Sequence, residues 1–173
     1  MIRKSFSLRE EEEKKDMATP TQTQQPTGTV RFHRIFMAPP ERVYRAVLDP
    51  AANAKWLSPY GFTCTVHHMD AKVGGTYRMS FTNFSTGTVH AFGGTYVELV
   101  PNQKIVATDV FEDPNMPGEM KTTYEFREVS VGTEVLIVQE NLPAMIPPEA
   151  CTLGWQESLE QLAKLVERDI PDM

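Results

Sequence analysis

Two histidines and an aspartate stand close together in one short segment and could ligate a metal ion. His67, His68 and Asp70 lie in the run HHMD, and imidazole and carboxylate groups are common metal ligands. The segment has the period-two pattern of a β-strand, on which adjacent side chains point to opposite faces. His67 and His68 are therefore expected on opposite faces, with His68 and Asp70 on one. Two ligands on a face do not make a site, so we predict solvated or core-rim histidines and no bound metal.

Four glutamates could supply a pair of carboxylates for acid–base catalysis: Glu125, Glu128, Glu134 and Glu140. A catalytic pair must be enclosed, because enclosure is what shifts the pKa values apart. Glu134 and Glu140 alternate with Val135, so they are expected on the face opposite to the apolar one, in contact with water. We predict no catalytic residues among them, and the residues favour a non-enzymatic protein.

The two cysteines, Cys64 and Cys151, allow a disulfide or two free thiols. Cys151 stands near the start of an expected helix, where the helix dipole could lower its pKa. It also belongs to the apolar stripe of that helix, so we expect a buried, unreactive thiol. Free thiols are typical of a reducing compartment. The sequence has no GxSxG, P-loop or GxGxxG motif, and we predict no cofactor.

Composition limits the class of protein. The chain has 173 residues, of which 40% are hydrophobic, and a formal net charge of −6. This fits one domain with a sizeable core, as a monomer or homodimer, and lacks the basic footprint of a nucleic-acid-binding protein. No apolar run suits a signal peptide or reaches the ~20 residues of a membrane helix, so we expect no membrane insertion and a cytoplasmic location.

Residues 1–29 differ from the rest of the chain. They contain the run ATPTQTQQPTGT, which is polar and has nothing to bury. Such composition does not offset the entropy of ordering. We predict a disordered tail over residues 1–29 and a folded domain over residues 30–170.

The folded part shows mainly the period of β-strands. Two short helices, over residues 41–48 and 51–57, are expected after the first strand, because prolines and Asp49 mark their ends. Strands are expected over residues 30–37, 62–70, 76–84, 89–100, 104–111, 121–128 and 133–139. Gly93 and Gly94 stand inside one strand, where glycines often mark a bend. Short links between successive strands favour an antiparallel meander.

The period returns to 3.6 residues near the C-terminus. Cys151, Trp155, Leu159, Leu162 and Val166 form an apolar stripe on a helix of about 20 residues. One helix must cover a wide sheet, so the sheet is expected to curve around it. The predicted fold is therefore α+β, a helix-grip: a curved antiparallel sheet of about six to seven strands around a long C-terminal helix, with two short helices after the first strand.

Several runs together resemble one family from about residue 30 to the C-terminus. They are PPERVYRAVLDPAANAKWL, GFTCTVHHMDAKVGGTYRMSF, GGTYVELVPNQKIV and TEVLIVQ, followed by GW-x-x-SL-x-x-L in the last helix. In order and spacing they are similar to the SRPBCC (START-like) superfamily, and within it to single-domain bacterial proteins of the group named after the activator of heat-shock protein 90 ATPase. The resemblance implies a START/Bet v 1-like helix-grip fold with a cavity used for lipids, sterols and similar molecules.

Large apolar side chains could line such a cavity. A wide sheet closed over one helix often leaves a void that binds apolar ligands, and Gln139, on the inward face with Val135, would orient the ligand. The resemblance places the ligand between Trp155 and the strands. The predicted ligand-binding residues are Trp56, Phe62, Tyr77, Met79, Phe81, Phe92, Tyr124, Gln139 and Trp155.

Three functions follow as hypotheses. The first is non-enzymatic binding of a small apolar or amphipathic, lipid-like molecule between the sheet and the C-terminal helix. The second, implied by the resemblance, is a co-chaperone-like interaction module that activates a chaperone ATPase in the stress response. The third is a cyclase or hydrolase acting inside the cavity, for which Tyr77, His90 and Gln139 are poor material. A plain core without a physiological ligand is the alternative to all three.

Overall fold

The computed structural model describes residues 28–173. In chain order its elements are β1 (Gly28–Phe36), α1 (Pro40–Leu48), α2 (Pro50–Trp56), β2 (Phe62–Met69), β3 (Thr76–Asn83), β4 (Val89–Val100), β5 (Lys104–Phe111), β6 (Met120–Val129), β7 (Gly132–Leu142) and α3 (Pro148–Val166). β1 begins at Gly28, so two residues that we assigned to the tail form part of the sheet, where Gly28 pairs with Leu142. The rest of the predicted tail lies outside the described residues.

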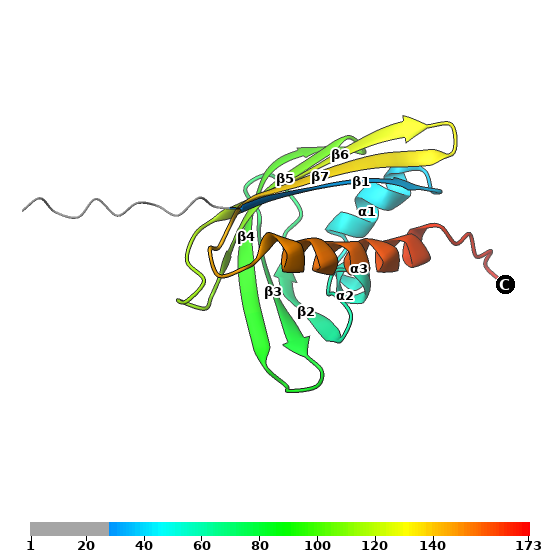
Figure 1. Ribbon diagram of the computed structural model, residues 1–173. Coiled ribbons are helices and arrows are strands. Elements are labelled where there is room, and N and C mark those ends of the chain that lie inside the picture. Colours follow the sequence, from blue (N-terminus) through cyan, green and yellow to red (C-terminus); the bar gives the residue numbers. More distant parts are fainter. Residues whose placement is uncertain (1–27) are drawn as a thin grey trace, which may run out of the picture.

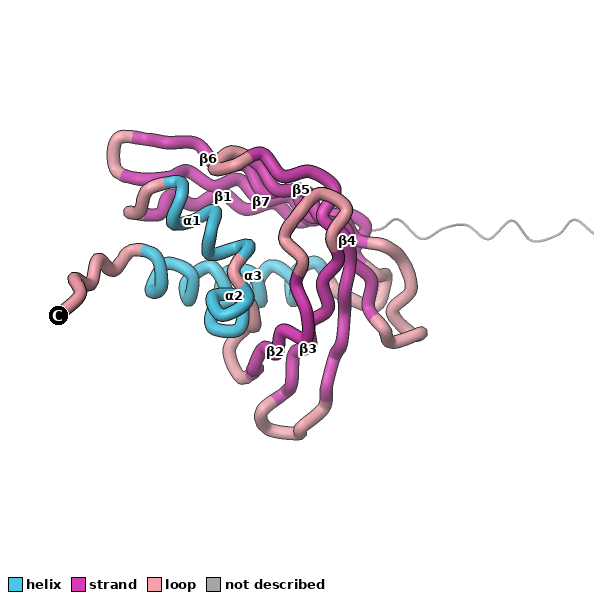
Figure 2. The backbone as a smooth tube through the Cα atoms, turned by 180° about the vertical axis from the view of Figure 1, so that it is seen from behind, coloured by secondary structure: helices cyan, strands magenta, loops and turns pink. Residues whose placement is uncertain are grey.

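The seven strands form one antiparallel sheet in the order β1-β7-β6-β5-β4-β3-β2. The first strand therefore lies beside the last, and β2 to β7 form a meander. Figure 1 shows that the sheet bends around α3, with β5, β6, β7 and β1 on one side of the bend and β4, β3 and β2 on the other. Figure 2 shows α1 and α2 on the same side of the sheet as α3. The predicted α+β helix-grip fold is confirmed.

The bend in β4 depends on its two glycines. A Cβ atom on Gly94 would lie 1.6 Å from the carbonyl oxygen of Thr108, and one on Gly93 would lie 2.5 Å from that of Tyr77. No side chain fits at either distance, so only glycine permits this close approach of β3 and β5 to β4. A register shift between Tyr96 and Glu98 bends the strand further.

The two short helices form the base of the core. Asp49 caps α2 by accepting a hydrogen bond from the Ala52 amide at 2.8 Å. Asn53 donates to the Val47 carbonyl at 2.8 Å, which holds α1 and α2 together. Trp56 is fully buried, and its indole N–H donates to the Ala46 carbonyl at 2.9 Å.

The long helix α3 buries only part of its apolar stripe. Leu159, Leu162 and Val166, in its C-terminal half, are buried in the core, whereas Cys151 and Trp155 are half-buried. The first turns of α3 therefore face an incompletely filled space. No helix within residues 28–173 is long and apolar enough to cross a membrane.

Candidate functional site

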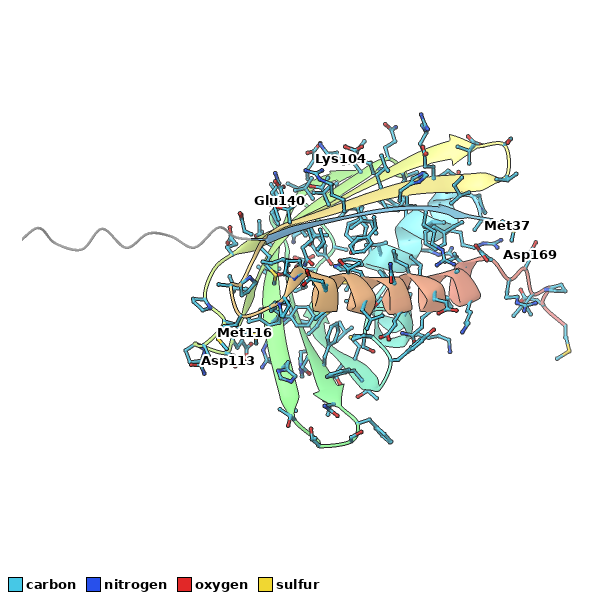
Figure 3. The ribbon with its side chains drawn as sticks, in the orientation of Figure 1. Met37, Lys104, Asp113, Met116, Glu140 and Asp169 are labelled. Carbon is cyan, nitrogen blue, oxygen red and sulfur yellow. The ribbon has the colours of Figure 1, made fainter. Side chains whose placement is uncertain are left out.

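A pocket of about 440 Å³ lies between the concave face of the sheet and the N-terminal half of α3. Its volume is within the usual range of small-molecule sites. Side chains from α2 and its flanking residues, from β2 to β7, and from α3 line it. The loop between β5 and β6 adds Met116, which Figure 3 shows near the first turn of α3, and Ile146, just before α3, also lines the pocket.

The structure brings together all but one of the residues that we predicted to bind a ligand. Those that line the pocket are Phe62, Tyr77, Met79, Phe81, Phe92, Tyr124, Gln139 and Trp155. Trp56 does not line it, because α2 directs this side chain into the packed core and onto the Ala46 carbonyl. Trp56 is thus a structural residue. A role in ligand binding stays a prediction for the others.

Gln139 is the centre of a hydrogen-bonded group at the wall of the pocket. As expected, it shares the inward face of β7 with Val135 and Ile137. Its Oε1 accepts from Trp155 Nε1 at 2.8 Å and from Cys151 Sγ at 3.4 Å. The indole N–H can only donate, so it fixes the oxygen of the amide toward α3. These bonds hold the first turns of α3 against the sheet.

Trp155 is held by aromatic contacts as well. Its ring lies 5.7 Å from that of Phe32 and 6.0 Å from that of Tyr124, measured between centroids. Such offset or edge-to-face pairs add to the stability of apolar burial. The indole is therefore fixed in position at the edge of the pocket.

Sequence reasoning missed Asp109, a carboxylate that lines the pocket from β5. Tyr77 Oη lies 3.3 Å from Asp109 Oδ2 and 3.1 Å from the Thr108 carbonyl. Tyr77 and Asp109 both pair with Gly94 in the sheet, which has no side chain to separate them. Asp109 Oδ1 is shielded from solvent and is the one buried side-chain nitrogen or oxygen without a partner among the residues described.

Burial dominates the electrostatics of this wall. It raises the pKa of Asp109 to about 7, and Glu119 adds to the rise, while the hydrogen bond from Tyr77 opposes it. Burial also raises the pKa of Tyr77, Tyr96 and Tyr124, so these phenols are neutral donors at physiological pH. The sequence alone could have indicated this position, because Asp109 is two residues from Ala107 and from Phe111 and therefore shares their inward face of β5.

The histidine cluster is arranged differently from our prediction. Both histidines are exposed, as predicted, but the register of β2 and β3 shifts between Val66 and His68, and this bulge places them on the same, outer face instead of on opposite faces. His67 Nε2 lies 2.9 Å from Ser80 Oγ, and His68 Nε2 lies 3.0 Å from Thr76 Oγ1. Neither histidine lines the pocket.

Glu134 and Glu140 lie on the outer face of the sheet, opposite to Val135. Glu134 binds His33 at 2.8 Å and Arg127, and Glu140 lies 3.9 Å from the ammonium group of Lys121. Hydrogen bonds from His33 and Arg127 hold the pKa of Glu134 below its usual value. These groups form surface ion pairs, away from the pocket, as their position in the alternation predicted.

Both cysteines are free thiols. Burial raises the pKa of Cys64 and of Cys151 to about 11, which leaves them protonated near neutral pH. Desolvation therefore outweighs any effect of the helix dipole on Cys151.

Seven antiparallel strands curved around a C-terminal helix, with an apolar pocket between them, define a helix-grip protein of the SRPBCC superfamily. More narrowly, the chain belongs to the family described as activator of Hsp90 ATPase homolog 1-like protein, whose family model matches residues 37–167. A comparison with curated proteins gives no match.

Solved structures share the fold. A protein from Chromobacterium violaceum is 57% identical, with a TM-score of 0.81 over 82% of this chain and 98% of that one. A protein from Rhodobacter sphaeroides is 22% identical (TM-score 0.71, 82% and 94% covered). The AHSA1 protein of Silicibacter pomeroyi is 20% identical (TM-score 0.69, 80% and 96% covered). At these last two identities, the likeness concerns the fold alone.

Proposed function

We propose that this protein binds a small apolar or amphipathic molecule in the pocket between the sheet and α3, without transforming it. The supporting observation is the pocket itself: about 440 Å³, lined mainly by apolar and aromatic side chains, with a few polar groups on the sheet side, among them Gln139, Asp109 and Thr122. Many apolar walls with a few placed polar groups are typical of small-molecule sites.

The protonation states of the lining residues favour binding over catalysis. The raised pKa values of Tyr77 and Cys151 keep a phenol and a thiol protonated, so neither is a ready base or nucleophile. The side-chain oxygen of Gln139 already accepts hydrogen bonds from Trp155 and Cys151. A carboxylate with a neutral phenol beside it suits recognition of a polar group.

The first test is native mass spectrometry of the protein purified from its own host, followed by organic extraction. A stoichiometric apolar adduct would support the proposal and give the ligand class. The variant Gly154→Leu should abolish this adduct, because Gly154 lines the pocket and only Pro59, at 3.8 Å, lies within reach of a new Cβ. Gly154→Ala is the matched control and should retain it. An empty wild-type protein that also fails to take up apolar compounds would refute the proposal.

A second candidate is activation of a chaperone ATPase, supported by the description of the family. One end of the molecule offers a surface for such a contact: Met37 and Val131 are exposed there, in segments brought together by β1 and β7. Figure 3 shows Met37 beside the C-terminal segment that carries Asp169, and the Met37 amide donates to Glu167. An increase in Hsp90 ATPase turnover that Met37→Asp abolishes would support this role in a stress response. No change in turnover would refute it.

We also propose a cytoplasmic location for the protein. Two unpaired cysteines, one buried and one half-buried, support this location, because thiols persist in reducing compartments. Fractionation of the host would test it, and recovery outside the cytoplasm would refute it.

A further inference from the structure

The carboxylate of Asp109 carries the one fully shielded side-chain oxygen or nitrogen without a partner among residues 28–173. Two buried hydroxyl groups of the core show the usual arrangement: Thr133 donates to the Ala38 carbonyl at 2.7 Å, and Ser158 donates to the Leu57 carbonyl at 2.8 Å. Asp109 Oδ2 accepts one bond from Tyr77, whereas Oδ1 has none. A buried carboxylate without donors is strongly disfavoured, so something outside the chain's own side chains is expected to supply one.

The position of Asp109 decides what could supply that donor. Its neighbours on the inward face of β5 are Ala107 and Phe111, and Met120 stands opposite on β6. None of these side chains has a donor. Asp109 itself lines the pocket, and the terminal torsion of an aspartate is broad. A small rotation therefore turns either oxygen toward a molecule in the pocket.

Resting on the proposed function, we propose that the ligand of this pocket is an amphipathic molecule whose hydroxyl or amine group donates a hydrogen bond to the Asp109 carboxylate. Gln139 does not compete for this role, because Trp155 and Cys151 already occupy its oxygen. The apolar body of the ligand then packs against the aromatic side chains of the pocket. The Asp109 carboxylate alone then makes the pocket prefer a ligand that donates a hydrogen bond over one that only accepts.

The test compares probes of equal size that differ in one donor. Decan-1-ol and 1-methoxynonane have the same number of non-hydrogen atoms, but only the alcohol donates. Isothermal titration calorimetry at pH 8.5, above the pKa of about 7 of Asp109, on the full chain stripped of bound lipid should show the alcohol binding about 10- to 100-fold more tightly, the usual effect of a hydrogen bond to a charged group. Decylamine distinguishes the two ligand sources: tighter binding than the alcohol indicates an amine, weaker binding a hydroxyl.

Two variants connect the preference to Asp109. Asp109→Leu should abolish the preference for the alcohol while leaving the ether bound, because this variant removes the carboxylate and retains an apolar wall. Asp109→Asn, which keeps the side-chain shape but not the charge, should reduce it. Thr122→Val is the control on the same wall, since Thr122 also lines the pocket, and it should keep the preference.

The outcomes separate this inference from the proposed function. Equal binding of alcohol and ether by the wild-type protein, or a preference that survives in Asp109→Leu, would overturn the inference and leave apolar binding intact. Failure of every probe to bind would overturn both. A preference present in the wild type and in Thr122→Val but lost in Asp109→Leu would support it.

Discussion

Replacing Asp109 by asparagine is expected to change how the free energy of unfolding depends on pH. Burial raises the pKa of Asp109 from 3.8 to about 7 in the folded protein. Below pH 3.8 the carboxyl group is protonated in both states, and burial of charge costs nothing. Between these values the unfolded chain loses the proton while the folded protein keeps it, so stability falls as pH rises. Above pH 7 the loss is complete.

The magnitude follows from the difference between the two pKa values, at 1.36 kcal/mol for each unit. Full enclosure would give about 4 kcal/mol. Asp109 is only half-buried as a residue, although its Oδ1 is shielded, so we expect about 2 to 4 kcal/mol. The difference in stability between Asp109→Asn and the wild type should therefore grow by this amount from pH 4 to pH 8. The constant cost of burying an amide cancels in this difference.

Urea unfolding of lipid-free protein at several pH values measures the effect. Asp172→Asn is the control for loss of a negative charge, because Asp172 is exposed in the C-terminal segment. Its curve should run parallel to that of the wild type. A difference between Asp109→Asn and wild type that is flat between pH 4 and 8, or that shrinks as pH rises, would refute the assignment of a desolvated carboxylate to the pocket wall.

Three further predictions concern other parts of the pocket and core. Gln139→Leu should destabilise the protein by about 1–3 kcal/mol in urea unfolding, because Trp155 loses its acceptor, whereas Gln139→Glu at pH 4, where a buried carboxyl group is protonated, keeps an acceptor and should cost less; equal costs at that pH would contradict this. Trp56→Phe should cost a similar amount, because the Ala46 carbonyl loses its bond from the indole N–H at 2.9 Å and keeps only that from Asn53 at 3.4 Å, yet it should leave decanol binding unchanged, and weaker binding would place Trp56 at the pocket after all. Cys151 should react slowly with an aromatic disulfide at pH 8, since its pKa is about 11, and decanol should slow it further; rapid modification unaffected by decanol would argue against both.

Much of the site could be predicted because side chains alternate along a strand. Gln139 falls on the inward face with Val135, and Tyr77 with Met79, from the period of two alone. The same rule could have identified Asp109 on the inward face of β5. It failed for His67 and His68, because a bulge adds a residue and shifts the alternation. A bulge depends on the pairing of two strands, which the local sequence does not encode.

The sequence by itself determined the elements, their order and, where no bulge intervenes, the face that each side chain takes. These follow from backbone geometry, which repeats every two residues in a strand and every 3.6 in a helix. Only the tertiary structure decided which inward side chains meet. Trp56 turns into the core onto Ala46, while Tyr77 reaches Asp109 across Gly94. Such contacts depend on register, curvature and the space left beside α3, because each joins residues that are distant in the chain.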